Sequence, residues 1–420
     1  MVDHRSHRIP RIALFCGGRG SATITRALLR NTNCQLSLLI NGFDDGRSTG
    51  TVRKLIPGML GPSDFRKNLA TALDLSAPYQ DALQRLVEQR LNDSQQLFGN
   101  DGLFGFVNHG DPARLSLPLA PLFSGLDPSV RARIRAHLER FFAYLAVTEQ
   151  YLAAGDIAIG NLLFAGIYLQ TRDVNTALRT FVELGLSKAD ILNVCDGACR
   201  WLVGLKEDGE VLASESAIVG PQSATAITHL YLLAQPLEPA QRQTLALLTW
   251  REKHAWLSQH EALLGHSAAA VNALAAADVI IFGPGTQHSS LLPSYRILAD
   301  ALSQSRAPLK LLIINLEPDY DNQSQSASDL IDRALIFMKD PDNAKQCISH
   351  TLYNTARTGA GAGVNPGKLA YSTHYRGIKI IRGDFRDPHE SCRHHGVRVV
   401  QTVFDLLDQM AGAMDARLVY

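Results

Sequence analysis

Short apolar runs recur along the chain, and most of them end where glycine, serine, asparagine or aspartate begins. The clearest runs are residues 12–16, 36–40, 191–194, 279–282 and 309–314. Their length is typical of buried strands, and stretches with helical patterning separate them. A chain that alternates strand and helix favours parallel strand pairing. We therefore predict an α/β fold of the Rossmann-like, doubly wound kind, with a mainly parallel sheet.

The same patterning predicts how the chain is divided. We expect one domain over residues 1–420, with a core made of residues 11–76 and 155–340. Residues 77–154 contain two helical stretches and are predicted to form a helical insertion, and residues 341–420 a C-terminal extension. Within the core, residues 201–205 and 211–218 flank an Asp-Gly pair, which indicates a β-hairpin.

Two adjacent carboxylates, Asp44 and Asp45, follow the second apolar run. Open α/β sheets bind ligands outside the carboxyl ends of their strands, so we expect these acids at a ligand-binding edge. Arg47 and Ser48 offer a planar cation and a hydroxyl to an anion, and Gly46 lets the backbone approach a ligand closely. The alternative is an ordinary strand-to-helix loop in which an aspartate caps the helix.

The first apolar run leads into a glycine turn and a helix, as in nucleotide-binding α/β folds. The turn consists of Gly17, Gly18, Arg19, Gly20 and Ser21. Such a turn directs amide groups at a phosphate. Thr23 stands where a dinucleotide fingerprint needs its third glycine, and no Gly-Lys-Ser/Thr follows. The segment therefore predicts a phosphate loop, but weakly supports plain NAD binding and is not a P-loop. Arg19 is either a clamp on a diphosphate or a solvated turn charge.

Further polar residues lie at helix starts and strand ends. Asp64, Arg66 and Asn68 open one helix, where Asp64 and Arg66 either contact a ligand or pair with each other. Asn161 opens an apolar helix, and a buried asparagine must be hydrogen-bonded. The remaining predicted ligand-binding residues follow the last two apolar runs and are Gly283, Gly285, Thr286, Ser289, Ser290 and Asn315.

Charge and composition argue against some classes of partner. The 41 basic and 40 acidic residues give a net charge of +1, so bulk charge favours neither nucleic acid nor a membrane surface. No apolar run reaches the roughly 18 residues that span a bilayer. The six cysteines lack zinc spacing, and a chain of this length needs no disulfides. We therefore expect reduced thiols and a cytoplasmic protein.

Taken in order, these segments resemble one family, the CofD/YvcK family of phospholactate transferase-like proteins. The resemblance is carried by Cys16-Gly17-Gly18-Arg19-Gly20, Asp44-Asp45-Gly46-Arg47-Ser48-Thr49-Gly50, Pro62-Ser63-Asp64-Phe65-Arg66-Lys67 with Asn68 one place later, Gly160-Asn161-Leu162-Leu163 and Gly283-Pro284-Gly285-Thr286. Against the family pattern, Cys16, Arg47 and Ser63 replace glycines, and Arg19 replaces a small residue. The two added cations favour a different or more anionic ligand.

The resemblance implies a core that holds a nucleotide diphosphate. CofD-type members use Mg²⁺ to transfer a phospholactyl group from a guanosine diphosphate ester to the hydroxyl of a deazaflavin. YvcK-type members bind nucleotide sugars and act in cell-shape control. We therefore expect a nucleoside diphosphate ester or a nucleotide sugar as the ligand and a hydroxyl acceptor, a deazaflavin being one candidate. Asp44, Asp45 and Arg66 are the predicted catalytic residues. Asp44 or Asp45 is expected to hold Mg²⁺, and the other carboxylate to orient the acceptor hydroxyl or take its proton. The rival is a non-catalytic nucleotide-sugar sensor, and a homodimer is one candidate assembly.

Overall fold

The computed structural model describes residues 9–150, 152, 155–355 and 363–417, without the side chains of Asn31, Arg47 and residues 411–417. Its centre is an eight-stranded sheet with the order β12-β13-β11-β10-β9-β1-β2-β5. Neighbouring strands run parallel, except for the antiparallel pair β12 and β13. The strands are β1 (Arg11–Phe15), β2 (Gln35–Ile40), β5 (Asp190–Asn193), β9 (Val279–Phe282), β10 (Leu309–Ile313), β11 (His350–Asn354), β12 (His374–Tyr375) and β13 (Ile378–Gly383). The predicted Rossmann-like, mainly parallel sheet is confirmed.

The strand order reverses between β1 and β9. From β1 the chain moves outward through β2 to β5, and it later returns to β9 on the other side of β1 and moves outward through β10 and β11. Ile12 in β1 accordingly pairs with Leu36 in β2 and with Val279 in β9. The loops that follow β1 and β9 therefore diverge. Doubly wound sheets bind their ligands in the crevice that this divergence opens.

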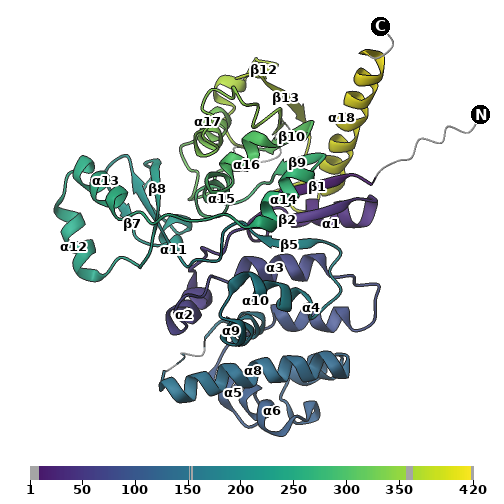
Figure 1. Ribbon diagram of the computed structural model, residues 1–420, viewed down its shortest axis with the longest axis vertical. Coiled ribbons are helices and arrows are strands. Elements are labelled where there is room, and N and C mark those ends of the chain that lie inside the picture. The colour runs from purple at the N-terminus through teal and green to yellow at the C-terminus, as the bar shows by residue number, and fades with distance from the viewer. Residues whose placement is uncertain (1–8, 151, 153–154, 356–362, 418–420) are drawn as a thin grey trace, which may run out of the picture.

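Helices lie over both faces of the sheet (Figure 1). In one group α1 packs against α3 and α18, and in the other α14 packs against α16 and α15 against α17. Their bounds are α1 (Ala22–Asn31), α3 (Ser63–Ala72), α18 (Gly396–Arg417), α14 (Ala268–Ala276), α15 (Leu292–Ile297), α16 (Ala299–Gln304) and α17 (Ala327–Phe337). The sheet is buried between these layers, so Leu14 and Ile281 are both fully inaccessible. Burial on both faces explains why these strands are apolar runs without alternation.

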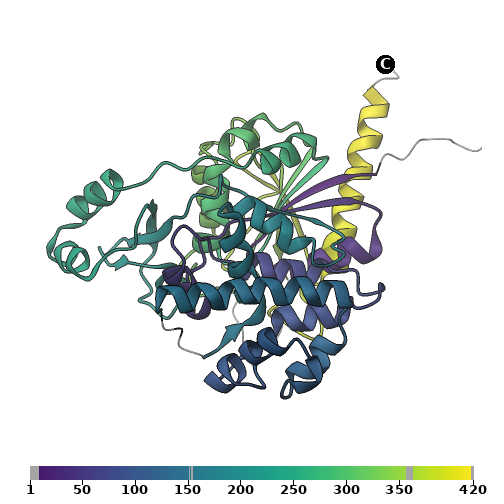
Figure 2. The ribbon, with the colours of Figure 1, turned by 60° about the horizontal axis from the view of Figure 1, so that its bottom comes forward.

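A further helical layer lies below the sheet, and Figure 2 brings it to the front. It includes α2 (Arg47–Leu55), α4 (Gln80–Glu88), α5 (Ser94–Phe98), α6 (Leu103–His109), η1 (Pro112–Arg114), α7 (Leu119–Ser124), α8 (Pro128–Thr148), α9 (Ile159–Thr171) and α10 (Val174–Val182), with β3 (Arg90–Leu91) paired to β4 (Ile157–Ala158). Phe142 of α8 packs edge-on against Phe98 and Phe104. No helix among the described residues combines the length and apolar content needed to cross a bilayer.

The C-terminal quarter of the chain contributes to the same sheet. Strands β11, β12 and β13 extend it beyond β10, with η3 (Gly367–Leu369) before β12. The closing helix α18 packs along α1. The division of the chain into a core, a helical insertion and a C-terminal extension stays a prediction.

A second, three-stranded sheet lies to one side of the main body (Figure 1). It has the order β7-β6-β8, and its elements are β6 (Trp201–Lys206), β7 (Val211–Leu212), α11 (Glu215–Val219), β8 (Ile227–Leu233), α12 (Pro239–Leu247) and α13 (Trp250–Gln259). The expected hairpin is therefore correct only in part, because β7 stops after two residues and α11 follows. Ser214 caps α11 by accepting a hydrogen bond from the Ala217 amide, which ends the strand.

Candidate functional site

The two glycine loops that follow β1 and β9 meet at the switch point. A methyl group added at Gly20 would lie 2.6 Å from the carbonyl oxygen of Pro284, and one added at Gly17 would lie 2.5 Å from Cβ of Ser290. Only glycine allows such close backbone approach at these positions. The structure thus brings together Gly17, Gly18, Gly20, Ser21, Gly283, Gly285 and Ser290, all predicted from the sequence.

Two asparagines fix the relative position of these loops. Asn68 on α3 donates from Nδ2 to the carbonyl oxygen of Gly17 at 2.7 Å. Asn41, directly after β2, donates from Nδ2 to the carbonyl oxygen of Ser290 at 2.5 Å and to Oγ of Ser294 at 3.0 Å. Both side chains are nearly inaccessible. Asn68 therefore holds the first loop in place through its side chain, and Asn41 is a positioning residue that the predicted site did not include.

The two predicted catalytic aspartates follow Asn41 and have different surroundings. Asp44 accepts hydrogen bonds from the Gly46 amide at 2.8 Å and from Oγ1 of Thr49 at 3.3 Å. Asp45 accepts one at 3.0 Å from the amide of Ser216 on α11. Burial raises the pKa of the Asp45 carboxyl, and this amide acts in the opposite direction. Asp45 thus ties the second sheet to the main body.

Glu215, which the sequence analysis missed, completes a group of four acids. A methyl added at Gly46 would lie 3.1 Å from Oδ1 of Asp44 and 3.9 Å from Oε2 of Glu215, so these carboxylates are neighbours. Burial raises the pKa of Glu215 well above its ordinary value, and the negative charges of Asp44, Asp45 and Asp64 add to the effect. Glu215 was overlooked because the segment containing it was interpreted as a strand.

We expect Glu215→Gln to stabilise the protein near neutral pH. The pKa of this carboxyl is 4.5 in the unfolded state and higher in the folded state. The carboxyl therefore favours folding at low pH, and this contribution to stability is lost as the pH rises from 4.5 through the pKa of the folded state. The advantage of the variant should therefore grow with pH across that interval, with a slope of at most about 1.4 kcal/mol per pH unit. Thermal unfolding between pH 5 and pH 8 without metal measures it.

Glu252→Gln is the control for this prediction. Glu252 is exposed, and the Thr249 hydroxyl lowers the pKa of its carboxyl. Its substitution should change stability in the opposite direction. An equal stability difference for Glu215→Gln at all pH values would contradict a carboxylate held under repulsion.

Lys67, also absent from the prediction, lies beside the first glycine loop. Its Nζ is 2.9 Å from Oδ1 of Asp64. A methyl added at Gly18 would lie 3.0 Å from both of these atoms. The Asp64 charge is the main cause that raises the pKa of Lys67. Of the two alternatives for Asp64, a pairing with Arg66 is thus not found among the described residues, and Asp64 pairs instead with Lys67, one helical turn away.

Arg66 is buried next to Asn161. Its Nε donates to Oδ1 of Asn161 at 3.1 Å, and Asn161 in turn donates from Nδ2 to Oγ of Ser48 at 3.4 Å and of Ser63 at 3.3 Å. Nη2 of Arg66 has no hydrogen-bond partner in the described part of the chain. Burial lowers the pKa of Arg66 to about 10. Arg66 is therefore a desolvated cation with one donor to spare.

The other two predicted cations, Arg19 and Arg47, add less to the described geometry of the site. The Arg19 side chain is 66% exposed and pairs with Glu88 at 3.2 Å, which matches the solvated alternative. The side chain of Arg47, at the first position of α2, lies outside the described residues.

The loop after β9 makes much of its own hydrogen bonding. Gly285 and Asn315 are joined twice, from the Gly285 amide to Oδ1 at 3.2 Å and from Nδ2 to the Gly285 carbonyl oxygen at 2.9 Å. Oγ1 of Thr286 lies 2.8 Å from Oγ of Ser289 and 2.9 Å from Oγ of Ser290. Asn315 therefore shapes the loop, and the three hydroxyls form one cluster.

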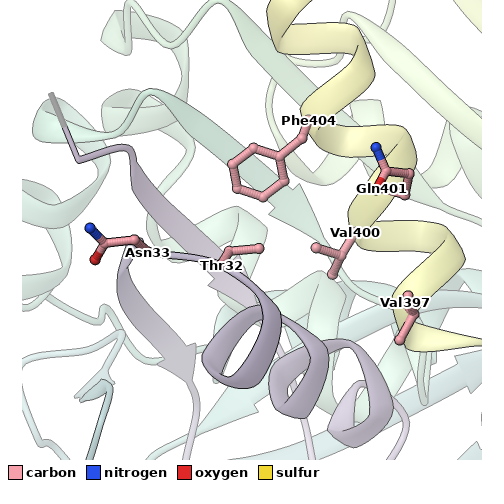
Figure 3. A pocket seen from close by; sticks show the side chains of 6 residues that line it. All are labelled: Thr32, Asn33, Val397, Val400, Gln401 and Phe404. Atoms are coloured by element: carbon pink, nitrogen blue, oxygen red, sulfur yellow. The ribbon is translucent and has the colours of Figure 1, made fainter. Parts of the chain in front are cut away.

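A separate pocket of about 230 Å³ lies between α1 and α18 (Figure 3). Its lining includes Thr32 and Asn33, which lie in the short connection between α1 and β2, and Phe404 of α18. It therefore lies at the amino ends of the strands, at the edge opposite to the glycine loops. This pocket is not part of the candidate site.

A metal at the acidic group would need oxygen atoms from a ligand. No group of three or more His, Cys, Asp or Glu side chains in the described residues has an arrangement that could hold a metal ion. The donors present are carboxylate oxygens, which are the ligands that Mg²⁺ prefers together with substrate phosphates. A divalent cation shared by Asp44 and Asp45 would also offset the repulsion that Glu215 experiences. The donor chemistry is therefore compatible with Mg²⁺ if a diphosphate supplies the remaining oxygen ligands, and the magnesium site stays a prediction.

Comparison with known proteins places the chain in a family. It is similar to a protein named putative gluconeogenesis factor from Nostoc sp. (strain PCC 7120), with 25% identity over 310 residues. The match covers 73% of this chain and 48% of the relative, so the chain spans about half the length of that protein. Two crystal structures of a UPF0052-family protein from Bacillus halodurans share its fold at a TM-score of 0.63 and 18% identity. Each match covers 94% of this chain and, respectively, 99% and 100% of the matched chain. The family model described as 2-phospho-L-lactate transferase CofD matches residues 12–362, and the chain therefore belongs to the CofD family.

Proposed function

We propose that this protein is a CofD-like transferase that moves a phosphoryl-linked group from a nucleoside diphosphate ester to an acceptor hydroxyl and releases a nucleoside monophosphate. The observation that carries the proposal is the close approach of two glycine loops at the switch point, with Asp64 and Lys67 beside the first of them. Asp44 and Asp45 follow the neighbouring strand β2, and Arg66 is buried on α3, the helix that carries Asp64 and Lys67. A bound diphosphate needs cations and amides around it, and phosphoryl transfer needs charge neutralisation and positioning.

Each group has a role in this reaction. The backbone of Gly17, Gly18 and Gly20 and the hydroxyls of Ser289 and Ser290 hold the diphosphate. Asp44 and Asp45 would hold Mg²⁺, which would supply positive charge next to the diphosphate and the leaving group. Lys67 and Arg66 add positive charge beside the same phosphates.

The bond changes are those of a substitution at phosphorus. The acceptor oxygen forms a bond to the phosphorus that carries the ester, and the bond from that phosphorus to the bridging oxygen breaks. The bridging oxygen leaves with the nucleoside monophosphate, and the acceptor hydroxyl loses its proton to a base. A deazaflavin is one candidate acceptor, by analogy with the family.

The alternative is a nucleotide-sugar-binding regulatory protein. Its support is the name of the Nostoc relative, putative gluconeogenesis factor, which describes no transfer reaction. Such a protein would use the glycine loops but would need neither Mg²⁺ nor an acceptor.

A ligand panel separates the two functions. We expect guanosine or uridine diphosphate esters to raise the thermal unfolding temperature only together with Mg²⁺, because the carboxylates otherwise repel the phosphates. At a concentration of 100 times the dissociation constant, a ligand should add about 2.7 kcal/mol to the free energy of unfolding. Binding without metal dependence and without release of nucleoside monophosphate would favour the regulatory protein.

A further inference from the structure

A histidine and an aspartate form a buried pair beside the proposed diphosphate site. His288 lies in η2 (Gln287–Leu291), a π-helical turn just before α15, and Asp321 lies in the loop after β10. Nδ1 of His288 is 2.8 Å from Oδ1 of Asp321, and the side chains are each 1% exposed. Single π-turns inside helices are frequent at functional sites.

The hydrogen bonds of Asp321 fix the orientation of the ring. Its carboxylate also accepts from the amides of His288, at 2.8 and 3.1 Å, and of Ser289, at 3.2 Å. A carboxylate that accepts at Nδ1 favours the tautomer in which Nδ1 carries the proton and Nε2 is bare. Two amides of this turn are thereby donated to Asp321, so they are not available to an anion.

Capping of the π-helical turn is a sufficient structural role for Asp321, but it gives no role to Nε2, the ring nitrogen of His288 that faces away from Asp321. Nε2 of His288 is buried and has no hydrogen-bond partner among the described residues. A bare imidazole nitrogen oriented by a carboxylate is the arrangement of a general base. Most buried polar atoms have a hydrogen-bond partner, so the unpaired Nε2 of His288 requires an explanation.

Further buried polar atoms without a partner occur in the same region. They are Nδ2 of Asn322 and Oε1 of Gln325, in the loop that holds Asp321, and Oε1 of Gln222. This loop lies on the segment after α11, where Nε2 of Gln323 donates to the Gln222 carbonyl oxygen at 3.2 Å. We call the contact between this loop (residues 319–325) and the segment after α11 (residues 220–224) the seam. It contains buried donors and acceptors that a polar ligand could pair with.

The seam is continuous with the acidic group through α11. The start of this helix is bonded to Asp45 through the Ser216 amide. Gln222 follows its last residue, Val219, and η2 packs against it. The helix α11 therefore connects the two regions, since it carries Glu215 of the acidic group at its start and contacts η2, which holds His288.

We propose that the seam binds the acceptor and that His288, positioned by Asp321, takes the proton from its hydroxyl. This inference rests on the proposed transfer function and names the base that the reaction needs. As the acceptor oxygen bonds to phosphorus, its proton passes to Nε2 and the nucleoside monophosphate leaves with the bridging oxygen. The acceptor is a hydroxyl compound with further polar groups, which Asn322 and Gln325 recognise.

The test separates nucleotide binding from turnover. In His288→Asn the side-chain amide can keep the hydrogen bond to Asp321 while Nε2 is lost. We expect the dissociation constant of GDP or UDP with Mg²⁺, measured by calorimetry, to change less than about twofold. The turnover number for release of nucleoside monophosphate from the corresponding diphosphate ester, with a deazaflavin or a diol as acceptor, should fall about 10²- to 10⁴-fold.

Two further variants keep the test decisive. Imidazole should restore part of the activity of His288→Ala, and substituted imidazoles should do so in the order of their basicity. Asp321→Asn should lower the turnover number without changing KM, since an amide can reverse the ring tautomer. Wild-type turnover in His288→Asn overturns the inference, as does an equal loss of nucleotide binding and turnover. If the wild-type protein binds GDP or UDP but releases no monophosphate from any ester, both the transfer function and the role of His288 as its base are refuted. If the wild-type protein binds neither nucleotide, the diphosphate site itself is refuted.

Discussion

Replacing both Asp44 and Asp45 by asparagine is expected to abolish release of nucleoside monophosphate while the fold is retained. The metal contributes several kcal/mol of charge stabilisation in such reactions, so we expect a loss of at least about 10³-fold. Each asparagine can still accept the amide hydrogen bond made by Gly46 or Ser216. Turnover as a function of Mg²⁺ concentration and thermal unfolding of the variant together measure the effect.

The single variants show which carboxylate matters more for the metal. Asp45 already accepts a backbone amide of α11, whereas Asp44 bonds within its own loop. We therefore expect Asp44→Asn to raise the Mg²⁺ requirement more than Asp45→Asn does. Full activity of the double variant, or wild-type activity in a chelator, would refute the metal site.

Much of this arrangement was predictable because parallel strands end at one edge of a sheet. Once the apolar runs were interpreted as parallel strands, Gly17, Asp44 and Gly283 had to lie at the same edge, although more than 200 positions separate the first from the last. The close approach of Gly20 to Pro284 is a direct result of this geometry.

Side-chain partners were predicted less well, since they depend on which helices the chain later brings to that edge. Glu215 reaches Asp44 from a small helix that the periodicity of residues 211–218 had indicated as a strand. Asp321 reaches His288 across 33 positions and gives no local signal. Arg19 is exposed and pairs with Glu88 on α4, a helix outside the recognised motifs.

Arg66 is the predicted residue whose surroundings are most informative. A guanidinium in the interior usually faces a carboxylate, because an unpaired buried charge is costly. Among the described residues no acidic oxygen forms an ion pair with Arg66, and its neighbours are Asn161 and the carbonyl oxygen of Val87. The charges of Glu88 and Asp64 act on Arg66 only from a distance, and Nη2 has no partner among the described residues, so we predict that an anionic ligand contacts this guanidinium.

Arg66→Met should therefore weaken nucleotide binding strongly while leaving the free protein folded. Hydrogen bonds to charged groups contribute about 1.5–3 kcal/mol, which corresponds to a loss of about 10- to 100-fold in affinity. In the free protein, loss of the contact to Asn161 is offset by removal of a buried, desolvated charge, so the unfolding temperature should change little. Calorimetric titration with GDP or UDP in the presence of Mg²⁺ measures the affinity.

Arg90→Met is the matched control, since it removes the same charge from a position nearby. The Arg90 charge is close enough to lower the pKa of Arg66, yet its own side chain is 40% exposed and pairs with Asp156 at 2.7 Å. Because water screens exposed charges, this variant should alter nucleotide affinity less than about threefold and only at low salt. Equal losses in the two variants would mean that Arg66 acts through the general field of the protein. A loss confined to Arg66→Met and insensitive to salt is the result that direct contact with the ligand requires.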